Sequence, residues 1–329
     1  MMRHVEVRKT ANYRWKRFFE DRCMTVERAP IVGPEDKIFA MGSCFSREIR
    51  NALVRRKYLV GPDYSNIPIN ELIYAIDELP ERNHINFYNT FTVLQEFERL
   101  SGRWTQERDD YWSISRKQFG SDHCFQDPYR RLTFGSTPVN LCKANKYISD
   151  TIEKAARTSS VFIFTFGVAE VFRLKSNDRI AGQKPAHFGG GGTSETSLHM
   201  STFAENLKNL ETLYELIKQL NQNARIIVTV SPVPLERTFS GRDIVVANSD
   251  GKSLLRAVLS EFTQCYKDVF YFPAYEMVNS LGEKAYIPGD LRHVKKSVVD
   301  MIIQVFINAH MTDNYATTTL QPDPLISAS

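Results

Sequence analysis

The chain has few cysteines and none of the spacings that mark a disulfide framework or a zinc site. Small secreted scaffolds and zinc ribbons place paired cysteines close together, and no CxxC pair occurs here. The histidines considered as ligands also lack metal-ligand spacing. The sequence therefore predicts neither a disulfide-rich domain nor a metal enzyme. The residues concerned are Cys23, Cys44, Cys124, Cys142 and Cys265, and His84, His123, His187 and His199.

Long apolar runs and a strong charge of either sign are absent as well. No segment approaches the roughly 18 consecutive apolar residues of a membrane span. The charged start, MMRHVEVRKTANYRWKRFFEDR, has no apolar stretch of the kind found in signal peptides. A net charge of +4 without a recognition motif does not indicate nucleic-acid binding. We therefore expect a cytoplasmic protein that has no membrane span and binds no nucleic acid.

What is present is enough apolar and aromatic side chain for a large core. The 329 residues are 42% hydrophobic and 12% aromatic, and short apolar runs alternate with segments of helical periodicity. Strands that alternate with helices indicate an α/β fold with a parallel sheet and helices on both faces. The expected strands are 37–41, 161–166, 225–230 and 268–272, and the expected helices are 45–60, 203–220, 253–262 and 294–306.

Three segments fall outside this alternation. Residues 1–36 are expected to form a basic and aromatic arm that packs on the domain, with docking of a protein partner as the alternative. Residues 61–150 are interpreted as an insertion that covers the sheet, and 311–329 as a flexible tail. The glycine run at 189–192 lacks the Lys-Ser/Thr of a phosphate-binding loop and predicts a solvent loop. One domain remains over residues 37–310.

Two short patterns place chemically active side chains after expected strands. Ligands of an open α/β sheet bind at the carboxyl ends of its strands, and Gly42-Ser43-Cys44 follows the first strand. A thiol on this turn lies at the positive end of a helix dipole, which is expected to lower its pKa and favour the thiolate. The alternative for Cys44 is a small buried residue in a close-packed turn.

The second pattern is Asp290-x-x-His293, just before the last expected helix. An aspartate at this spacing can hold one ring nitrogen of the histidine and leave the other to act as a base. The alternative is that Asp290 caps the helix and His293 is a partly exposed residue of its first turn. Both patterns are expected at the same sheet edge, so together they predict a nucleophile beside a base.

The segment FAMGSCFS, residues 39–46, resembles the signature of the GSCFA-domain family, with Ser46 where the family name has Ala. Further similar segments follow in the family's order, between about residues 12 and 308. The chain is therefore similar to GSCFA proteins, which are grouped with the SGNH/GDSL-like hydrolases. The further segments are YSNI at 64–67, with Ser65 in place of Gly, TFGVAEV at 165–171, VTVSPVPL at 228–235, ANSDGKSLLRAV at 247–258, YFPAYE at 271–276 and DLRH at 290–293.

The resemblance implies a three-layer sandwich with a mostly parallel, flavodoxin-like sheet, and it implies roles for the residues. Cys44 takes the nucleophile position of an SGNH-like hydrolase, and Ser43 is the rival because a one-residue shift of the turn would exchange them. Asp290 and His293 match the late Asp-x-x-His pair. The Cys44 N–H and the side chain of Asn66 are candidate oxyanion donors.

The turn at residues 167–170 departs from the pattern of the group. Ala169 occupies the position at which the group has an Asn that donates a hydrogen bond to the oxyanion. The side chain of alanine has no hydrogen-bond donor. Glu170 offers a carboxylate, which either orients His293 or caps the following segment. Gly42, Gly167 and Glu170 complete the predicted substrate-binding set.

The function implied by the resemblance is an esterase or deacetylase that acts on an O-acylated carbohydrate or a similar small ester and needs no cofactor. One alternative is an O-acyltransferase of polysaccharide biosynthesis, with acyl-CoA as co-substrate. The other alternative is a non-catalytic module that binds a glycan or a protein. Loss of His293 separates the catalytic hypotheses from the binding hypothesis, because only an acyl enzyme needs the base.

Overall fold

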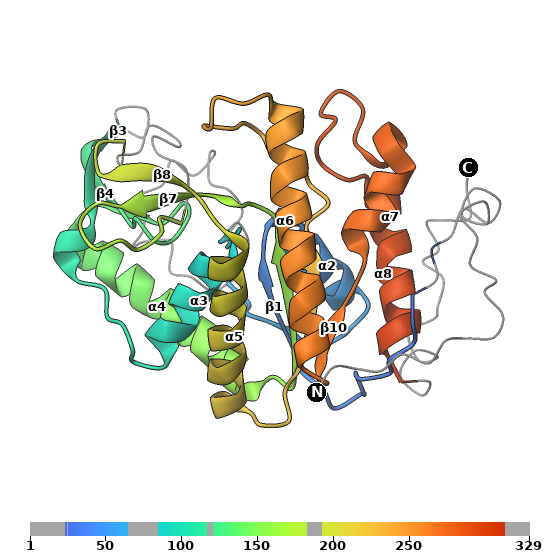
Figure 1. The fold of residues 1–329 in the computed structure, drawn as a ribbon. Coiled ribbons are helices and arrows are strands. Elements are labelled where there is room, and N and C mark those ends of the chain that lie inside the picture. The colour runs from blue at the N-terminus through green and yellow to red at the C-terminus, as the bar shows by residue number, and fades with distance from the viewer. Residues whose placement is uncertain (1–23, 25, 65–84, 117–120, 183–192, 313–329) are drawn as a thin grey trace.

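A five-stranded parallel sheet lies at the centre of the computed structural model, which describes residues 24, 26–64, 85–116, 121–182 and 193–312. The strand order is β10-β9-β6-β1-β2, and every neighbouring pair is parallel (Figure 1). This is the order of flavodoxin-like, doubly wound folds, so the predicted fold class is confirmed. The strands are β1 (Ile38–Gly42), β2 (Val60–Gly61), β6 (Val161–Phe166), β9 (Arg225–Val230) and β10 (Val269–Tyr271).

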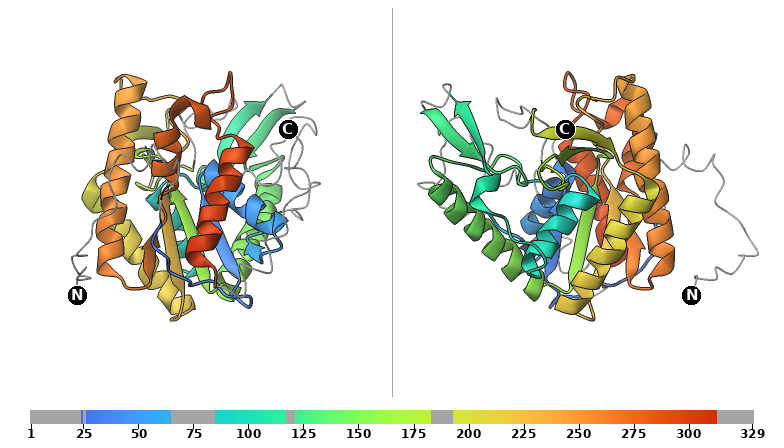
Figure 2. Two further views of the ribbon diagram at one scale, coloured as in Figure 1. Left: turned by 90° about the vertical axis from the view of Figure 1, so that its right-hand side faces the viewer. Right: turned by 60° about the vertical axis from the view of Figure 1, so that its left-hand side comes forward.

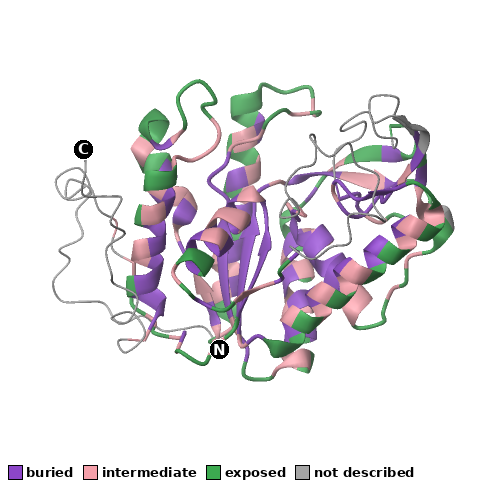
Figure 3. Cartoon of the chain, turned by 180° about the vertical axis from the view of Figure 1, so that it is seen from behind, coloured by how far each residue is buried: buried purple, intermediate pink, exposed green. Residues whose placement is uncertain are grey.

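Helices cover both faces of the sheet, which explains why its strands are apolar at nearly every position. Side chains of β6 alternate between the faces: Phe162 and Phe164 pack with one helical layer, and Ile163 packs with the other. Figure 3 shows the buried strands between helices whose outer sides are exposed. One layer contains α3 (Thr90–Leu100), α4 (Pro138–Thr158), α5 (Phe203–Leu220) and α6 (Ile244–Cys265), and the other contains α2 (Cys44–Arg55), α7 (Ala274–Leu281) and α8 (Lys296–His310).

The expected helices are all present, but three of them have other bounds. The helix expected at 45–60 ends at Arg55, since Val60 already belongs to β2, and the helix expected at 294–306 covers Lys296–His310. Helix α5 has the predicted bounds, and its Thr202 and Glu205 form a capping box. Helix α6 begins at Ile244 rather than at 253, because its first turns lie in solvent: Val245 is 72% exposed. A periodic apolar pattern predicts only the part of a helix that packs against the rest of the protein. Helices α2 and α8 are joined by ion pairs from Arg55 and Arg56 to Asp300.

The segment at 61–150 contains α3, the greater part of α4 and a small antiparallel sheet. Both helices pack against the main sheet, whereas the small sheet projects from one side of the molecule (Figure 2). Arg130 connects α3 with α4. Its side chain is fully buried, pairs with Glu96 of α3 at 2.6 Å and donates to Asn145 O of α4 at 2.7 Å. The small sheet is β3 (Trp112–Arg116), β4 (Ser121–Gln126) and β5 (Phe134–Gly135).

The remaining elements are short, and the ends of the chain are described only in part. After β6, strands β7 (Glu170–Leu174) and β8 (Thr196–Met200) form an antiparallel pair. Two short 3-10 helices are η3 (Arg108–Asp110) and η6 (Gly282–Ala285). Most of the predicted arm and tail, and the glycine run at 189–192, lie outside the described residues. Among the described helices, none combines the length and apolar character of a bilayer span.

His310 should make stability fall in mild acid. It ends α8 in contact with Phe272 and Phe306, and burial lowers its pKa to about 4. Stability from this group is complete above pH 6.5 and is lost as the pH falls towards 4, because only the unfolded chain takes up the proton there. We expect His310→Phe to reduce the loss of unfolding free energy between pH 7.5 and pH 5 by about 2 kcal/mol in urea titrations. Equal losses in both proteins would contradict this assignment.

Candidate active site

The turn after β1 requires a glycine. Gly42 has a φ of +147°, and a Cβ at this position would lie 2.3 Å from the carbonyl oxygen of Thr165 on β6. The close approach lets the Ser43 N–H donate to Thr165 Oγ1 at 2.9 Å and to Thr165 O at 3.1 Å. The turn is thereby fixed to the neighbouring strand, and α2 begins immediately at Cys44.

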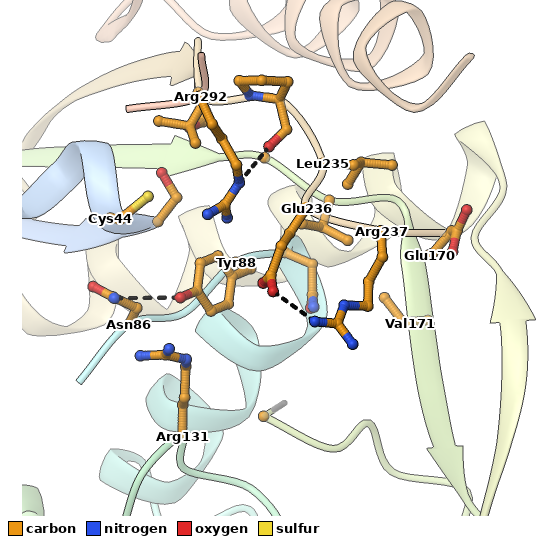
Figure 4. Close-up of a pocket in the computed structure, with 18 of the residues that line it drawn as sticks. Cys44, Asn86, Tyr88, Arg131, Glu170, Val171, Leu235, Glu236, Arg237 and Arg292 are labelled. Carbon is orange, nitrogen blue, oxygen red and sulfur yellow. Dashed lines mark hydrogen bonds and ion pairs between the residues drawn. The ribbon is translucent and has the colours of Figure 1, made fainter. Parts of the chain in front are cut away.

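Ser43 and Cys44 occupy different environments in this turn. Ser43 is the N-cap of α2: its Oγ accepts from the Phe45 N–H at 3.3 Å and lies 3.0 Å from Thr165 Oγ1, and the residue is 2% exposed. Cys44 is half-buried, and both residues contribute to the lining of a cavity of about 330 Å³ (Figure 4). As the first residue of the helix, Cys44 has an N–H without an intrahelical acceptor.

The thiol of Cys44 is less acidic than the sequence suggests. Burial raises its pKa, although Arg292, Arg47, Lys252 and Arg131 all act in the opposite direction. The expectation that the helix terminus lowers the thiol pKa is therefore wrong, because lost hydration outweighs the surrounding positive charge. A neutral thiol needs a base to become a nucleophile.

Asp290 and His293 form the predicted pair. His293 Nδ1 lies 2.6 Å from Asp290 Oδ2, and this hydrogen bond lowers the pKa of Asp290. A carboxylate only accepts hydrogen bonds, so Nδ1 carries the proton and Nε2 is left as the basic nitrogen. His293 lines the same cavity as Cys44. The alternative role of Asp290 as a helix cap is wrong, since α8 begins at Lys296 and its N-cap is Lys295.

The turn after β6 contributes less than predicted. The Gly167 N–H already donates to Tyr88 O at 2.8 Å. Glu170 accepts from the Thr238 hydroxyl and from the Phe239 N–H at 3.0 Å, so it anchors the loop after β9. The alternative in which Glu170 orients His293 is therefore wrong. Gly167 and Glu170 line the cavity, Gly42 does not, and Asn66 lies outside the described residues.

Sequence reasoning missed Asn86 and Tyr88, which line the cavity beside Cys44 (Figure 4). Asn86 Nδ2 donates to Tyr88 Oη at 3.4 Å. Their segment is held at the sheet edge because the Phe87 N–H donates to Gly42 O at 2.8 Å and Tyr88 O receives the Gly167 N–H. No periodicity marks this segment, and only its contacts with the strand ends place it in the site.

Lys252 was also missed, and it fixes the backbone of residues that line the cavity. Its ammonium donates to three carbonyl oxygens, those of Gly167 at 2.9 Å, Ser231 at 2.8 Å and Val233 at 2.9 Å. Burial, with a further contribution from Arg292, lowers its pKa to about 7. The sequence did contain a signal for this residue: a lysine lies on the apolar face of α6, three residues before Leu255, and a buried lysine is rare unless it is paired.

The sequence model of the GSCFA family matches residues 37–306, which is most of the chain. The chain belongs to the GSCFA family. A similar solved structure is a family 3 carbohydrate esterase from Clostridium thermocellum, 11% identical at a TM-score of 0.33, with 86% of this chain and 98% of that chain covered. The comparison with curated proteins finds no match. In the described part of this GSCFA protein, no three His, Cys, Asp or Glu side chains are grouped to hold a metal ion.

The raised pKa of Cys44 predicts slow alkylation in this GSCFA protein. Cys265 is exposed at the end of α6 and serves as the internal comparison. Because the thiolate is the reactive form, we expect iodoacetamide at pH 7.5 to modify Cys44 roughly tenfold more slowly than Cys265, as measured by peptide mass spectrometry. The difference should vanish in urea. Faster modification of Cys44 in the native protein would show that its thiolate is stabilised.

Proposed function

We propose that this GSCFA protein is an acyl-ester enzyme in which Cys44 is the nucleophile and His293 the general base. The observation that carries the proposal is the shared cavity, in which a thiol at a helix start and an aspartate-bound histidine are both part of the lining. The raised pKa of the thiol fits this division of labour, because the base then removes the proton as the sulfur attacks.

The proposed reaction runs through a thioester. His293 Nε2 takes the thiol proton, and Sγ of Cys44 attacks the ester carbonyl carbon to form a tetrahedral oxyanion. The carbon–oxygen bond to the alcohol then breaks, and the alcohol leaves with the proton from His293. Water attacks the thioester with His293 again as base, which releases the acid and restores the thiol. Asp290 keeps the imidazole in the required tautomer.

Two donors are available for the oxyanion in this proposal. The Cys44 N–H has no intrahelical acceptor, and Asn86 uses one of its two amide hydrogens for Tyr88 and retains the other. Asn86 thus supplies the amide that Ala169 lacks. Asn66 remains a predicted donor.

Ser43 is the weaker candidate for the nucleophile. Its hydroxyl caps α2 and is hydrogen-bonded to Thr165 Oγ1, whereas the Cys44 side chain is not engaged in the cap. Moving Ser43 Oγ into attack would break the cap, which typically costs about 1 kcal/mol.

The proposed substrate class is an O-acylated carbohydrate or a similar small ester. A cavity of about 330 Å³ is within the size range of small-molecule sites. Tyr88, Phe172 and Phe239 give its wall apolar faces, and Asn86 and Ser231 give it polar groups. Transfer of the acyl group to a sugar hydroxyl, with acyl-CoA as donor, uses the same side chains and remains the alternative.

Trapping the acyl enzyme tests the proposal. Intact mass after acid quench with 4-nitrophenyl acetate should show one acetyl group on the wild type and on Ser43→Ala, and none on Cys44→Ala. Loss of the base in His293→Ala should slow the appearance of the adduct by about a hundredfold or more. Peptide mapping assigns the site.

Cys265→Ala is the matched control, because it removes an exposed thiol that can be acetylated without the site. An adduct lost in Ser43→Ala and kept in Cys44→Ala would move the nucleophile by one residue. No adduct and no turnover in any protein would overturn catalysis in favour of a binding module. Transfer from acetyl-CoA to an added sugar, rather than to water, would identify a transferase.

A further inference from the structure

Part of the lining of the Cys44 cavity is apolar. The described lining residues include apolar side chains from strand β7, from residue 181 and from the loop after β9. Apolar walls with a few polar groups are typical of small-molecule sites, and here the polar groups include the thiol of Cys44. The apolar wall consists of Val171, Phe172, Ala181, Val233, Leu235 and Phe239.

Hydrogen bonds and ring packing hold the apolar wall in place. The Phe239 N–H donates to Glu170 at 3.0 Å, and the Phe239 ring packs edge-on against Phe172 at 5.2 Å between ring centres. The Leu235 N–H donates to Asn248 Oδ1 of α6 at 3.0 Å. Because these contacts fix both halves of the loop after β9, a ligand that binds there does not have to order the loop.

Two side chains of the apolar wall keep surface that a ligand can cover. Phe239 is 45% exposed although it belongs to the lining, and Leu235 is half-buried. Apolar surface contributes to binding when a ligand removes it from water. The apolar wall therefore favours a ligand group that is itself apolar.

The proposed reaction indicates which part of an ester reaches the apolar wall. His293 gives its proton to the leaving alcohol, so the alcohol lies beside His293, a partly exposed residue. The acyl group stays bonded to Sγ of Cys44 after the alcohol has left, and it needs room of its own in the cavity. Figure 4 shows the ring of Tyr88 between Cys44 and Val171 of the apolar wall. An alkyl chain that starts at Cys44 and passes Tyr88 reaches this wall.

We propose that the apolar wall binds the acyl chain of the ester, and that this chain is an alkyl group of butyryl size or larger rather than acetyl. The inference rests on the proposed function for the ester chemistry, whereas the affinity of the apolar wall for an alkyl chain is independent of catalysis. Each methylene that leaves water contributes about fourfold to binding, so the chain length of the acyl group decides specificity.

Alkylation of Cys44 tests the apolar wall without ester chemistry. N-butylmaleimide carries two methylenes more than N-ethylmaleimide, and both reagents alkylate thiols. Peptide mass spectrometry should show that the butyl reagent modifies Cys44 roughly tenfold faster than the ethyl reagent. The exposed Cys265 is the internal comparison and should react with both at the same rate. An equal ratio of rates at the two cysteines would overturn the apolar wall as a binding site.

Two matched pairs of variants assign the effect to the apolar wall. Phe239→Ala and Leu235→Asn should each reduce the butyl preference at Cys44 to roughly threefold or less. Phe203→Ala and Leu198→Asn should keep it, since Phe203 and Leu198 are 39% and 36% exposed and do not line the cavity.

Circular dichroism and the unfolding midpoint establish that each variant is folded. Because Phe239 is 45% exposed, Phe239→Ala leaves the core intact and remains informative if Leu235→Asn is unstable. An unchanged butyl preference in folded Phe239→Ala would overturn the assignment.

Turnover separates this inference from the proposed function. After division by the rate constants of hydroxide-catalysed hydrolysis, kcat/KM for 4-nitrophenyl butyrate should exceed that for the acetate by roughly tenfold. The preference should fall in Phe239→Ala and persist in Phe203→Ala. Turnover with equal or greater kcat/KM for the acetate would overturn the chain-length proposal and keep the ester enzyme. A butyl preference in alkylation without hydrolysis of either ester would support the apolar wall and overturn the ester chemistry.

Discussion

The contact between Gly42 and Thr165 is the constraint on which the proposed site depends. A side chain at Gly42 would collide with the neighbouring strand, so only glycine lets β1 and β6 end side by side. The two hydrogen bonds from Ser43 to Thr165 then turn the chain at once into α2. The first residue of the helix is Cys44. The turn thus makes Ser43 the N-cap of α2 and places Cys44 in the lining of the cavity.

The other walls of the cavity are held by backbone hydrogen bonds rather than by packing alone. Lys252 joins the ends of β6 and β9 through three carbonyl oxygens, and the segment around Tyr88 is fastened to Gly42 and Gly167. These bonds let loops of irregular sequence keep fixed positions. Under the proposed chemistry, the Cys44 thiol, whose pKa is raised by burial, keeps its proton until His293 removes it, and Asp290 sets the tautomer of His293.

The sequence was enough to predict the elements whose apolar residues occur in regular patterns. Apolar runs located β1, β6, β9 and β10, and the strand ends located Cys44 and His293 on one edge. The pKa of Cys44 was predicted in the wrong direction, because burial is a tertiary property that a helix start does not reveal. Asn86 and Arg131 were missed because they lie in aperiodic segments, where only contacts made after folding assign a position.

The order of these parts along the chain has a consequence for biosynthesis. A chain made from its amino end presents Cys44 well before His293 and before the α8 helix, which pairs with Arg55 and Arg56 through Asp300. A ribosome-bound intermediate thus holds the thiol without its base. Under the proposed chemistry, base-assisted attack by Cys44 begins only when the segment that carries His293 has folded beside the turn after β1.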